Sequence, residues 1–179
     1  QNGQIKHYEL PGKTINSIFE LPDGQLTLCL SQGVCTFNPS TGRIDPVKSK
    51  SGLKVTGVKQ LVKLKNNLLL GLDAEGLFIY DWTKGTLSLV KMMGKKYKTA
   101  NFSRYNSICV DHRGCFWLAT QDGLQVWNPK NNQMVNIHTE DGLVNNSVQS
   151  VFEDTHHTMW VITANGISHL TVSNDFLHY

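Results

Sequence analysis

The sequence predicts an all-β protein built from β-propeller blades, and three observations support this prediction. A glycine that follows a polar residue and precedes an apolar one recurs four times, at Gly33, Gly76, Gly123 and Gly166. The spacings between these glycines are 43, 47 and 43 residues. Each unit also contains short β-branched and aromatic runs separated by turn-forming residues, and no stretch keeps a helical period. Repeats of about 40–45 residues with four short strands and fixed glycine and aromatic positions are typical of propellers.

The third unit shows the expected strands most clearly. These strands cover residues 107–110, 115–120, 124–128 and 134–138. The first turn, Asp111–Gly114, ends in glycine, which tolerates the positive φ that a tight turn requires. The second turn, Gln121–Gly123, separates the two most apolar strands, and the fourth strand is the most polar. The unit is therefore expected to form one four-stranded antiparallel blade.

One position of the repeat carries tryptophan in the two most regular units. Trp117 in the third unit aligns with Trp160 in the fourth without gaps. Thr27 and Leu70 occupy the same position in the first two units. Repetition at one position is what packing between neighbouring blades requires, so we assign Trp117 and Trp160 to the core rather than to a ligand site.

The whole chain, residues 1–179, is expected to form a single propeller segment. Blades are expected over about residues 15–48, 58–91, 105–138 and 147–179. The leading residues 1–12 resemble the outer strand of a preceding blade, with a strand over Ile5–Leu10. Because five outer strands are counted against four inner sets, we expect the chain to be part of a larger propeller. That propeller is expected to be of the seven-bladed type. The open ends of such a stretch would expose apolar faces, so self-association is expected.

The composition excludes several classes of protein. The 17 basic and 14 acidic residues give a net charge of +3, far from the dense basic stripe of a nucleic-acid-binding protein. No apolar run approaches the roughly 20 residues of a membrane-spanning helix, so direct membrane insertion is not expected. Apolar content of 40% fits a folded, globular chain.

Four cysteines form two pairs, each separated by six residues across an expected turn: Cys29 with Cys35, and Cys109 with Cys115. One interpretation is two cross-strand disulfides in an oxidising compartment. The favoured interpretation is four buried free thiols that act as small apolar residues. No pair has the Cys-x-x-Cys spacing of zinc or thioredoxin-type sites.

No catalytic constellation can be recognised in the sequence. The seven histidines are scattered, with His156 and His157 in an expected hairpin turn. Gly-x-Ser-x-Gly, His-Glu-x-x-His and repeated carboxylate pairs are absent from the sequence. We therefore expect a binding or sensing module without enzymatic activity, cofactor or metal.

In a propeller, the crossing loops between blades and the turns between second and third strands lie on one face, where ligands usually bind. The candidate ligand-binding residues on this face are Arg104, Tyr105, Asn106, Gln121, Asp122, Asn145, Asn146 and Asn165. Amide and guanidinium groups can bind sugar hydroxyls or a carboxylate, and the Tyr105 ring could stack on a sugar. The same residue types also fit ordinary turn and capping roles.

One segment, Lys91–Arg104, contains five basic residues and no acidic one. Lys95, Lys96 and Lys98 lie at its centre, within an expected crossing loop. A basic loop on the binding face suits an anionic ligand, such as an acidic saccharide. An ordinary solvated loop fits the same residues, and the sequence leaves both interpretations open.

The repeated residues follow a recognisable family pattern. The pattern is carried by Asp111, Gly114, Trp117, Thr120, Gly123 and Leu124, and again by Asp154, Trp160, Thr163 and Gly166. It resembles the two-component regulator propeller repeat. This resemblance implies the periplasmic sensor region of a Bacteroidetes hybrid histidine kinase, with kinase activity elsewhere in the parent protein. It also implies an oligosaccharide ligand and control of polysaccharide-utilisation genes; the alternative is a protein-interaction scaffold.

Overall fold

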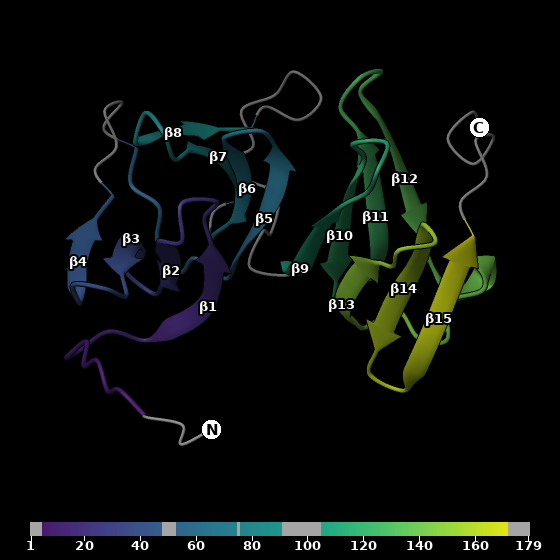
Figure 1. Ribbon diagram of the computed structural model, residues 1–179. Helices are drawn as coiled ribbons and strands as arrows, with labels where there is room; N and C mark the ends of the chain where they lie inside the picture. The colour runs from purple at the N-terminus through teal and green to yellow at the C-terminus, as the bar shows by residue number, and fades with distance from the viewer. Residues whose placement is uncertain (1–4, 48–52, 75, 91–104, 172–179) are drawn as a thin grey trace.

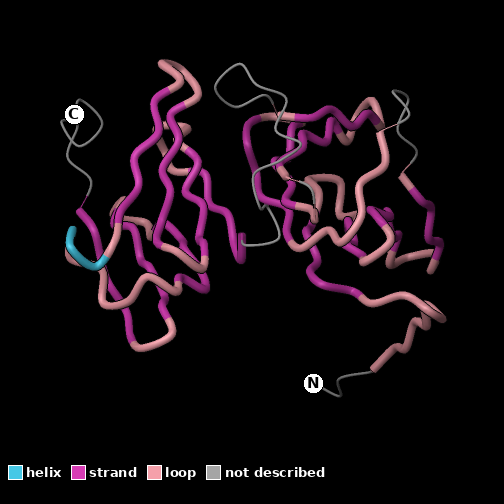
Figure 2. The backbone as a smooth tube through the Cα atoms, turned by 180° about the vertical axis from the view of Figure 1, so that it is seen from behind, coloured by secondary structure: helices cyan, strands magenta, loops and turns pink. Residues whose placement is uncertain are grey.

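The computed structural model describes residues 5–47, 53–74, 76–90 and 105–171, and these residues form an all-β structure (Figure 1). The described helical structure is limited to one 3-10 turn, η2 (Thr139–Asp141), which is drawn in cyan in Figure 2. No described helix is long and apolar enough to cross a membrane. The predicted fold class is therefore confirmed.

The strands form four consecutive antiparallel sheets, here called blades 1 to 4, and each sheet keeps its strands in chain order. Blade 1 contains β1 (Ile15–Glu20), β2 (Leu26–Leu30), β3 (Gly33–Asn38) and β4 (Arg43–Pro46). Blade 2 contains β5 (Gln60–Lys65), β6 (Leu68–Leu72), β7 (Leu77–Asp81) and β8 (Thr86–Leu89). Blade 3 contains β9 (Tyr105–Val110), β10 (Phe116–Thr120), β11 (Gly123–Asn128) and β12 (Gln133–Ile137). The described part of blade 4 contains β13 (Val148–Glu153), β14 (Thr158–Thr163) and β15 (Gly166–Thr171).

The blades follow one another around a common centre. Figure 1 shows the first strand of each blade toward the middle of the molecule and the fourth strands, β4, β8 and β12, toward the periphery. Neighbouring blades touch through these inner strands, β1 with β5, β5 with β9 and β9 with β13. Among the described strands, blade 4 makes no comparable contact with blade 1. The described chain is therefore an open arc of blades.

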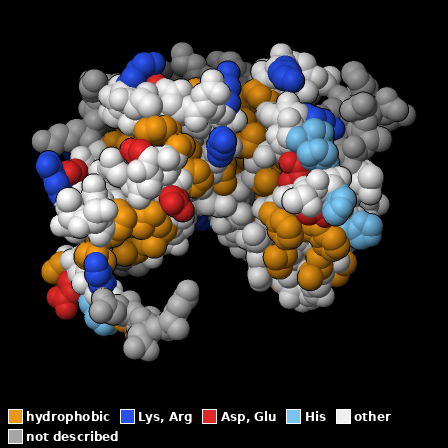
Figure 3. All heavy atoms as spheres, viewed as in Figure 1, with side chains coloured by type: hydrophobic (Ala, Val, Ile, Leu, Met, Phe, Trp, Pro, Cys, Tyr) orange, Lys and Arg blue, Asp and Glu red, His pale blue; other side chains and the backbone are white. Residues whose placement is uncertain are grey.

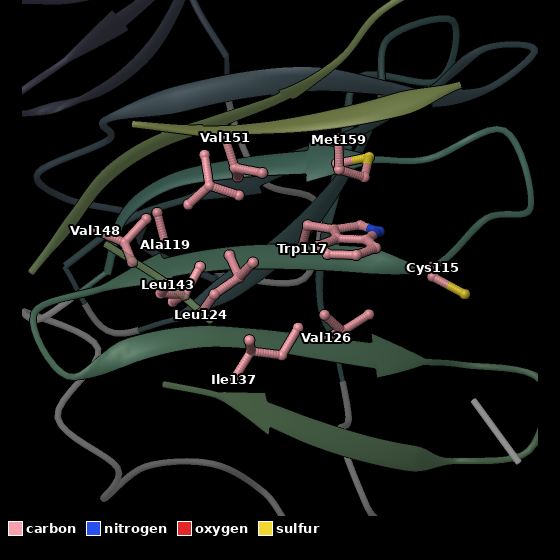
Figure 4. Packing of buried hydrophobic residues seen from close by; sticks show 11 residues of the cluster. Cys115, Trp117, Ala119, Leu124, Val126, Ile137, Leu143, Val148, Val151 and Met159 are labelled. Atoms are coloured by element: carbon pink, nitrogen blue, oxygen red, sulfur yellow. The ribbon is translucent and has the colours of Figure 1, made fainter. Parts of the chain in front are cut away.

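Apolar side chains fill the three junctions between consecutive blades. Thr27, Leu70 and Trp117 occupy the same repeat position in blades 1 to 3, and each is 0% exposed. Figure 4 shows the Trp117 ring between β10 and the side chain of Met159 in blade 4. Trp160, at the same position in blade 4, is only half-buried. The side chain at this repeat position therefore faces the following blade, as predicted for Trp117. Trp160 is less buried because no described blade follows blade 4.

The repeated aspartate explains the fixed spacing to tryptophan. The Trp117 indole N–H donates to Asp111 Oδ2 at 3.0 Å, and the Cys115 amide donates to Asp111 Oδ1 at 2.8 Å. In blade 4, the Trp160 indole donates to Asp154 Oδ2 at 2.8 Å. The aspartate therefore closes the first turn of its blade and fixes the orientation of the tryptophan six residues later. Burial raises the pKa of Asp111, but hydrogen bonds from Trp117 and from Arg113 outweigh it and hold this pKa below its usual range.

A second repeated contact joins each blade to the next. One polar side chain at the start of the first strand donates to a backbone carbonyl of the following blade: Asn16 to Val58 at 2.7 Å, Lys59 to Tyr105, and Asn106 to Val148 at 2.7 Å. Gln149 occupies this position in blade 4, and its side chain is exposed. Blade 4 therefore carries the same donor on a face that no described blade covers.

The predicted leading strand over Ile5–Leu10 is wrong for this chain, because residues 5–10 form no strand. The third strands β3, β7 and β11 pair with the fourth strands of their own blades, and no described strand pairs with residues 5–10. Instead the Tyr8 ring packs edge-on against Phe37, with ring centroids 4.8 Å apart. The segment thereby covers part of the outer face of blade 1. The fourth strand expected at the end of blade 4 lies outside the described residues.

All four cysteines are free thiols, as the favoured interpretation predicted, but only Cys29, Cys35 and Cys115 are buried, while Cys109 is partly exposed. In blade 1, Cys29 pairs with Val34 and Leu28 pairs with Cys35. This register places the two thiols on opposite faces of the sheet, so they cannot form a bond. Burial raises the pKa of all four thiols, and that of Cys109 to about 11.

Candidate functional site

A groove between blades 1 and 2 opens on the face that carries the crossing loops. Its volume is about 420 Å³, within the range of about 300–1,000 Å³ that is usual for small-molecule sites. Gln32 and Gly33 in the turn between β2 and β3 line one part, and residues 53–56 of the crossing loop line another.

The groove combines an apolar lining with positive charge. Its apolar side chains include Leu30, Val34, Val47, Leu53, Val55 and Leu87. Lys13, which precedes β1, and Lys54, in the crossing loop, add two exposed ammonium groups. Thr56 and Gln32 provide further hydrogen-bonding groups. This arrangement suits a ligand with an apolar surface and an anionic group.

Backbone hydrogen bonds hold the loops of the groove in place. The Gly57 amide donates to the Ser31 carbonyl at 2.8 Å, so the crossing loop is tied to the turn between β2 and β3. Gly33 has a φ of 131°, and a Cβ atom at this position would lie 3.4 Å from the Val55 carbonyl oxygen. The recurring glycine therefore allows the turn to approach the crossing loop closely.

Tyr105 does not form the stacking surface that the sequence suggested. It begins β9, is only 8% exposed, and packs in the core between blades 2 and 3. Its hydroxyl lies 2.7 Å from Gln125 Oε1, to which it donates a hydrogen bond. The ring is therefore a structural element of the blade junction.

The other described candidates lie on the expected face, but the side chains of several already form hydrogen bonds within the protein. Gln121 Oε1 accepts from the Ser147 hydroxyl at 3.0 Å. Asn145 Oδ1 accepts from the Ser147 amide at 2.8 Å, and Asn146 Oδ1 from the Thr139 amide at 2.8 Å. The first of these bonds joins the turn of blade 3 to the crossing loop, and the other two lie within the crossing loop. Asn106 makes the contact between blades described above.

Asp122 in blade 3 and Asn165 in blade 4 are exposed at turns of the crossing-loop face, as is Gln121. Arg104, Lys95, Lys96 and Lys98 lie outside the described residues. The structure therefore brings Gln121, Asn145 and Asn146 together, and it places the groove at a different pair of blades.

Sequence reasoning missed Lys13 and Lys54 as candidate ligand-binding residues. Each lies in a segment that enters the first strand of a blade, after Pro11-Gly12 and Gly52-Leu53 respectively. The presence of a lysine before the first strand of both blade 1 and blade 2 is the sequence signal that could have identified these two residues.

A second groove, of about 330 Å³, lies on the opposite face of the same two blades. Phe19 and Trp82 give it an aromatic wall, and Lys63 and Glu20 contribute charges. It lacks contact with any crossing loop among the described residues that line it. We therefore take the first groove as the candidate site and the second as an internal control.

The fold and groove define an open array of propeller blades with a ligand-sized groove on the crossing-loop face. No protein-family model and no curated protein matches the chain. Solved structures do: the extracellular domain of BT4673 from B. thetaiotaomicron, described as a hybrid two-component system, has a TM-score of 0.72 and 22% identity over 94% of this chain. That of BT3049, from the same organism, has a TM-score of 0.76 and 18% identity over 96%. Each match spans 23% of the neighbour's own chain.

These two neighbours are extracellular domains of Bacteroides two-component systems, and this chain shares their fold, as the repeat pattern implied. A streptogramin B lyase also matches, with a TM-score of 0.60 and 13% identity over 93% of this chain and 57% of its own. The same blades therefore serve unrelated functions, and function has to be argued from the site.

Proposed function

We propose that this chain is a ligand-sensing segment of a periplasmic propeller in a hybrid two-component sensor kinase. Its ligand is an oligosaccharide, with an acidic one favoured, and its output is the control of polysaccharide-utilisation genes. The likeness in fold to the extracellular domains of BT4673 and BT3049, over nearly the whole chain, carries this proposal.

The groove between blades 1 and 2 supports a ligand-binding role. Lys13 and Lys54 can bind a carboxylate or sulfate, while the apolar lining can contact a sugar ring. No aromatic ring is among the described residues that line the groove. Charge and hydrogen bonding, rather than stacking, are therefore expected to dominate recognition.

The outer face of blade 4 supports the view that further blades belong to the functional unit. Phe152 is 47% exposed and Ile167 is 62% exposed, next to the half-buried Trp160. Figure 3 shows hydrophobic side chains gathered on the lower part of the half that contains β13–β15. In blades 1 to 3 the corresponding face is covered by the next blade. We propose that another blade of the parent protein covers it here; self-association of the isolated segment stays a prediction.

Calorimetric titration of the intact sensor region with a panel of neutral, uronic and sulfated oligosaccharides tests the ligand. We expect saturable binding of at least one acidic member, weakened about tenfold or more in a Lys13→Ala/Lys54→Ala variant. Affinity should also fall as salt rises, because exposed charges are screened. Lys63→Ala, which changes the second groove, is the matched control and should bind as the unchanged protein does.

A protein-interaction scaffold is the second candidate, and the exposed apolar face of blade 4 is the observation that favours it. Absence of binding across the whole panel, together with a stable protein partner recovered by affinity purification, would contradict the sensor proposal. Binding that the Lys13→Ala/Lys54→Ala variant leaves unchanged would show that the ligand site is not the first groove.

A further inference from the structure

Three side chains able to bind a metal ion converge at the junction of blades 3 and 4, on the face opposite the crossing loops. His112 follows β9, Glu153 ends β13, and His157 lies in the turn between β13 and β14. One ligand atom from each residue lies within 4.8 Å of the other two. Figure 3 shows histidine and acidic side chains close together on this half of the molecule.

The carboxylate of Glu153 lies between the two turns. Its Oε1 contacts Nδ1 of His112 and lies 3.4 Å from Nδ1 of His157. Its Oε2 accepts a hydrogen bond from the His112 backbone amide at 2.8 Å. This second bond fixes the carboxylate so that Oε1 faces both imidazoles, as outer contacts do for ligands in metal sites.

The backbone at His157 gives an independent reason to examine this cluster. His157 has a φ of 65°, in the left-handed region, and its equivalents in the other regular units are Gly24 and Gly114. Glycine adopts this conformation freely, whereas a histidine there is strained. The chain therefore keeps an imidazole at a position where the repeat favours glycine, and such strain is often associated with functional sites.

The repeat does not require these residue types. At the junction of blades 1 and 2, the aligned positions are Pro22 and Lys63, which cannot form such a site. At the junction of blades 2 and 3, Val110 and Gly114 take the places of Glu153 and His157. The ligand set is therefore specific to the junction of blades 3 and 4.

Two imidazole nitrogens and a carboxylate oxygen form a ligand set that suits Zn²⁺ and similar divalent transition ions. With bonds of about 2.0–2.2 Å, two ligand atoms on a tetrahedral ion lie about 3.4 Å apart, which is the separation of Glu153 Oε1 and His157 Nδ1. The two rings stack with centroids 3.9 Å apart and must separate to about 5 Å around such an ion. Their side chains, 38% and 58% exposed, have room for this movement.

We propose that His112, Glu153 and His157 bind a divalent transition-metal ion of the Zn²⁺ type, which clamps the turns of blades 3 and 4 together. Three protein ligands leave a tetrahedral ion one position for water or for a group from a partner. Because the ion binds the folded junction, it stabilises the packing of blade 4 on blade 3.

Titration of the whole chain with Zn²⁺ in a non-chelating buffer near pH 7.5 tests the site. We expect one ion per chain, a dissociation constant in the micromolar range or tighter, and a higher Tm with Zn²⁺. Mg²⁺ and Ca²⁺ should produce neither effect, since they prefer sites made of oxygen ligands.

His157→Gly is the decisive variant, because it restores the residue of the other units and should fold at least as well without metal. We expect it, and His112→Asn, to weaken Zn²⁺ binding at least tenfold and to abolish the Tm increase. His156→Ala, at the neighbouring histidine, should bind as the unchanged protein does. Absence of saturable binding, or equal binding by His157→Gly and His112→Asn, would overturn the proposal.

Discussion

Replacement of Trp117 by alanine is expected to lower the free energy of unfolding by about 3–5 kcal/mol, the usual cost of removing a large buried aromatic side chain. Trp117 is completely buried and contacts Met159 and neighbouring side chains across the junction of blades 3 and 4. The change also leaves Asp111 without its indole donor. Urea denaturation followed by circular dichroism, at a fixed protein concentration, measures the loss.

Trp160→Ala is the matched control, because it removes the same side chain at the same repeat position of blade 4. Trp160 is only half-buried in this chain, so the expected loss is about 1–2 kcal/mol. Equal losses for the two variants would contradict the assignment of this repeat position to packing against the following blade.

Asp111→Ala is expected to lower the free energy of unfolding by about 2–4 kcal/mol, because buried donors lose their acceptor. The change leaves the Trp117 indole, the Cys115 amide and the Arg113 guanidinium unpaired. Asp154→Ala should cost less, since Asp154 has no arginine partner among the described contacts. Denaturant titration of both variants compares the two turns, and a greater loss for Asp154→Ala would contradict this explanation.

The contribution of Asp111 should also depend on pH. Its pKa in the folded state lies below that of the unfolded chain, so the stabilisation is fully present above about pH 4, the usual aspartate pKa. It is lost as the pH falls through the lower folded-state value. The stability difference between the unchanged protein and Asp111→Ala should therefore shrink in acid and stay constant between pH 6 and 8.

The sequence was sufficient to predict the blades because their determinants are local and repeated. Gly123 and Trp117 recur at fixed offsets, and the structure gives each a direct reason: a close turn for the glycine and a blade junction for the tryptophan. The aspartate at position 111 belongs to the same local unit. Such local residues predict the strands and turns of a blade without knowledge of which blades are in contact.

The sites could not be predicted in the same way, because they depend on contacts between blades. Lys13 and Lys54 lie 41 residues apart and come to one groove only when blade 2 packs on blade 1. His112 and Glu153 meet for the same reason, at the junction of blades 3 and 4. Tyr105 was misjudged because β9 begins at that residue, which makes its side chain part of the strand rather than of the loop.

Accessibility of position 167 most directly tests the central claim, that the outer face of blade 4 belongs to a blade junction of a larger propeller. A cysteine introduced by Ile167→Cys would lie on this exposed face, while the four native thiols are largely buried and have raised pKa values. We expect a thiol reagent to modify it rapidly in residues 1–179 and at least tenfold more slowly in a parent chain that contains the following blade. Lys130→Cys, on the exposed turn between β11 and β12, should react at the same rate in both. Equal modification of Ile167→Cys in the two proteins would contradict the claim.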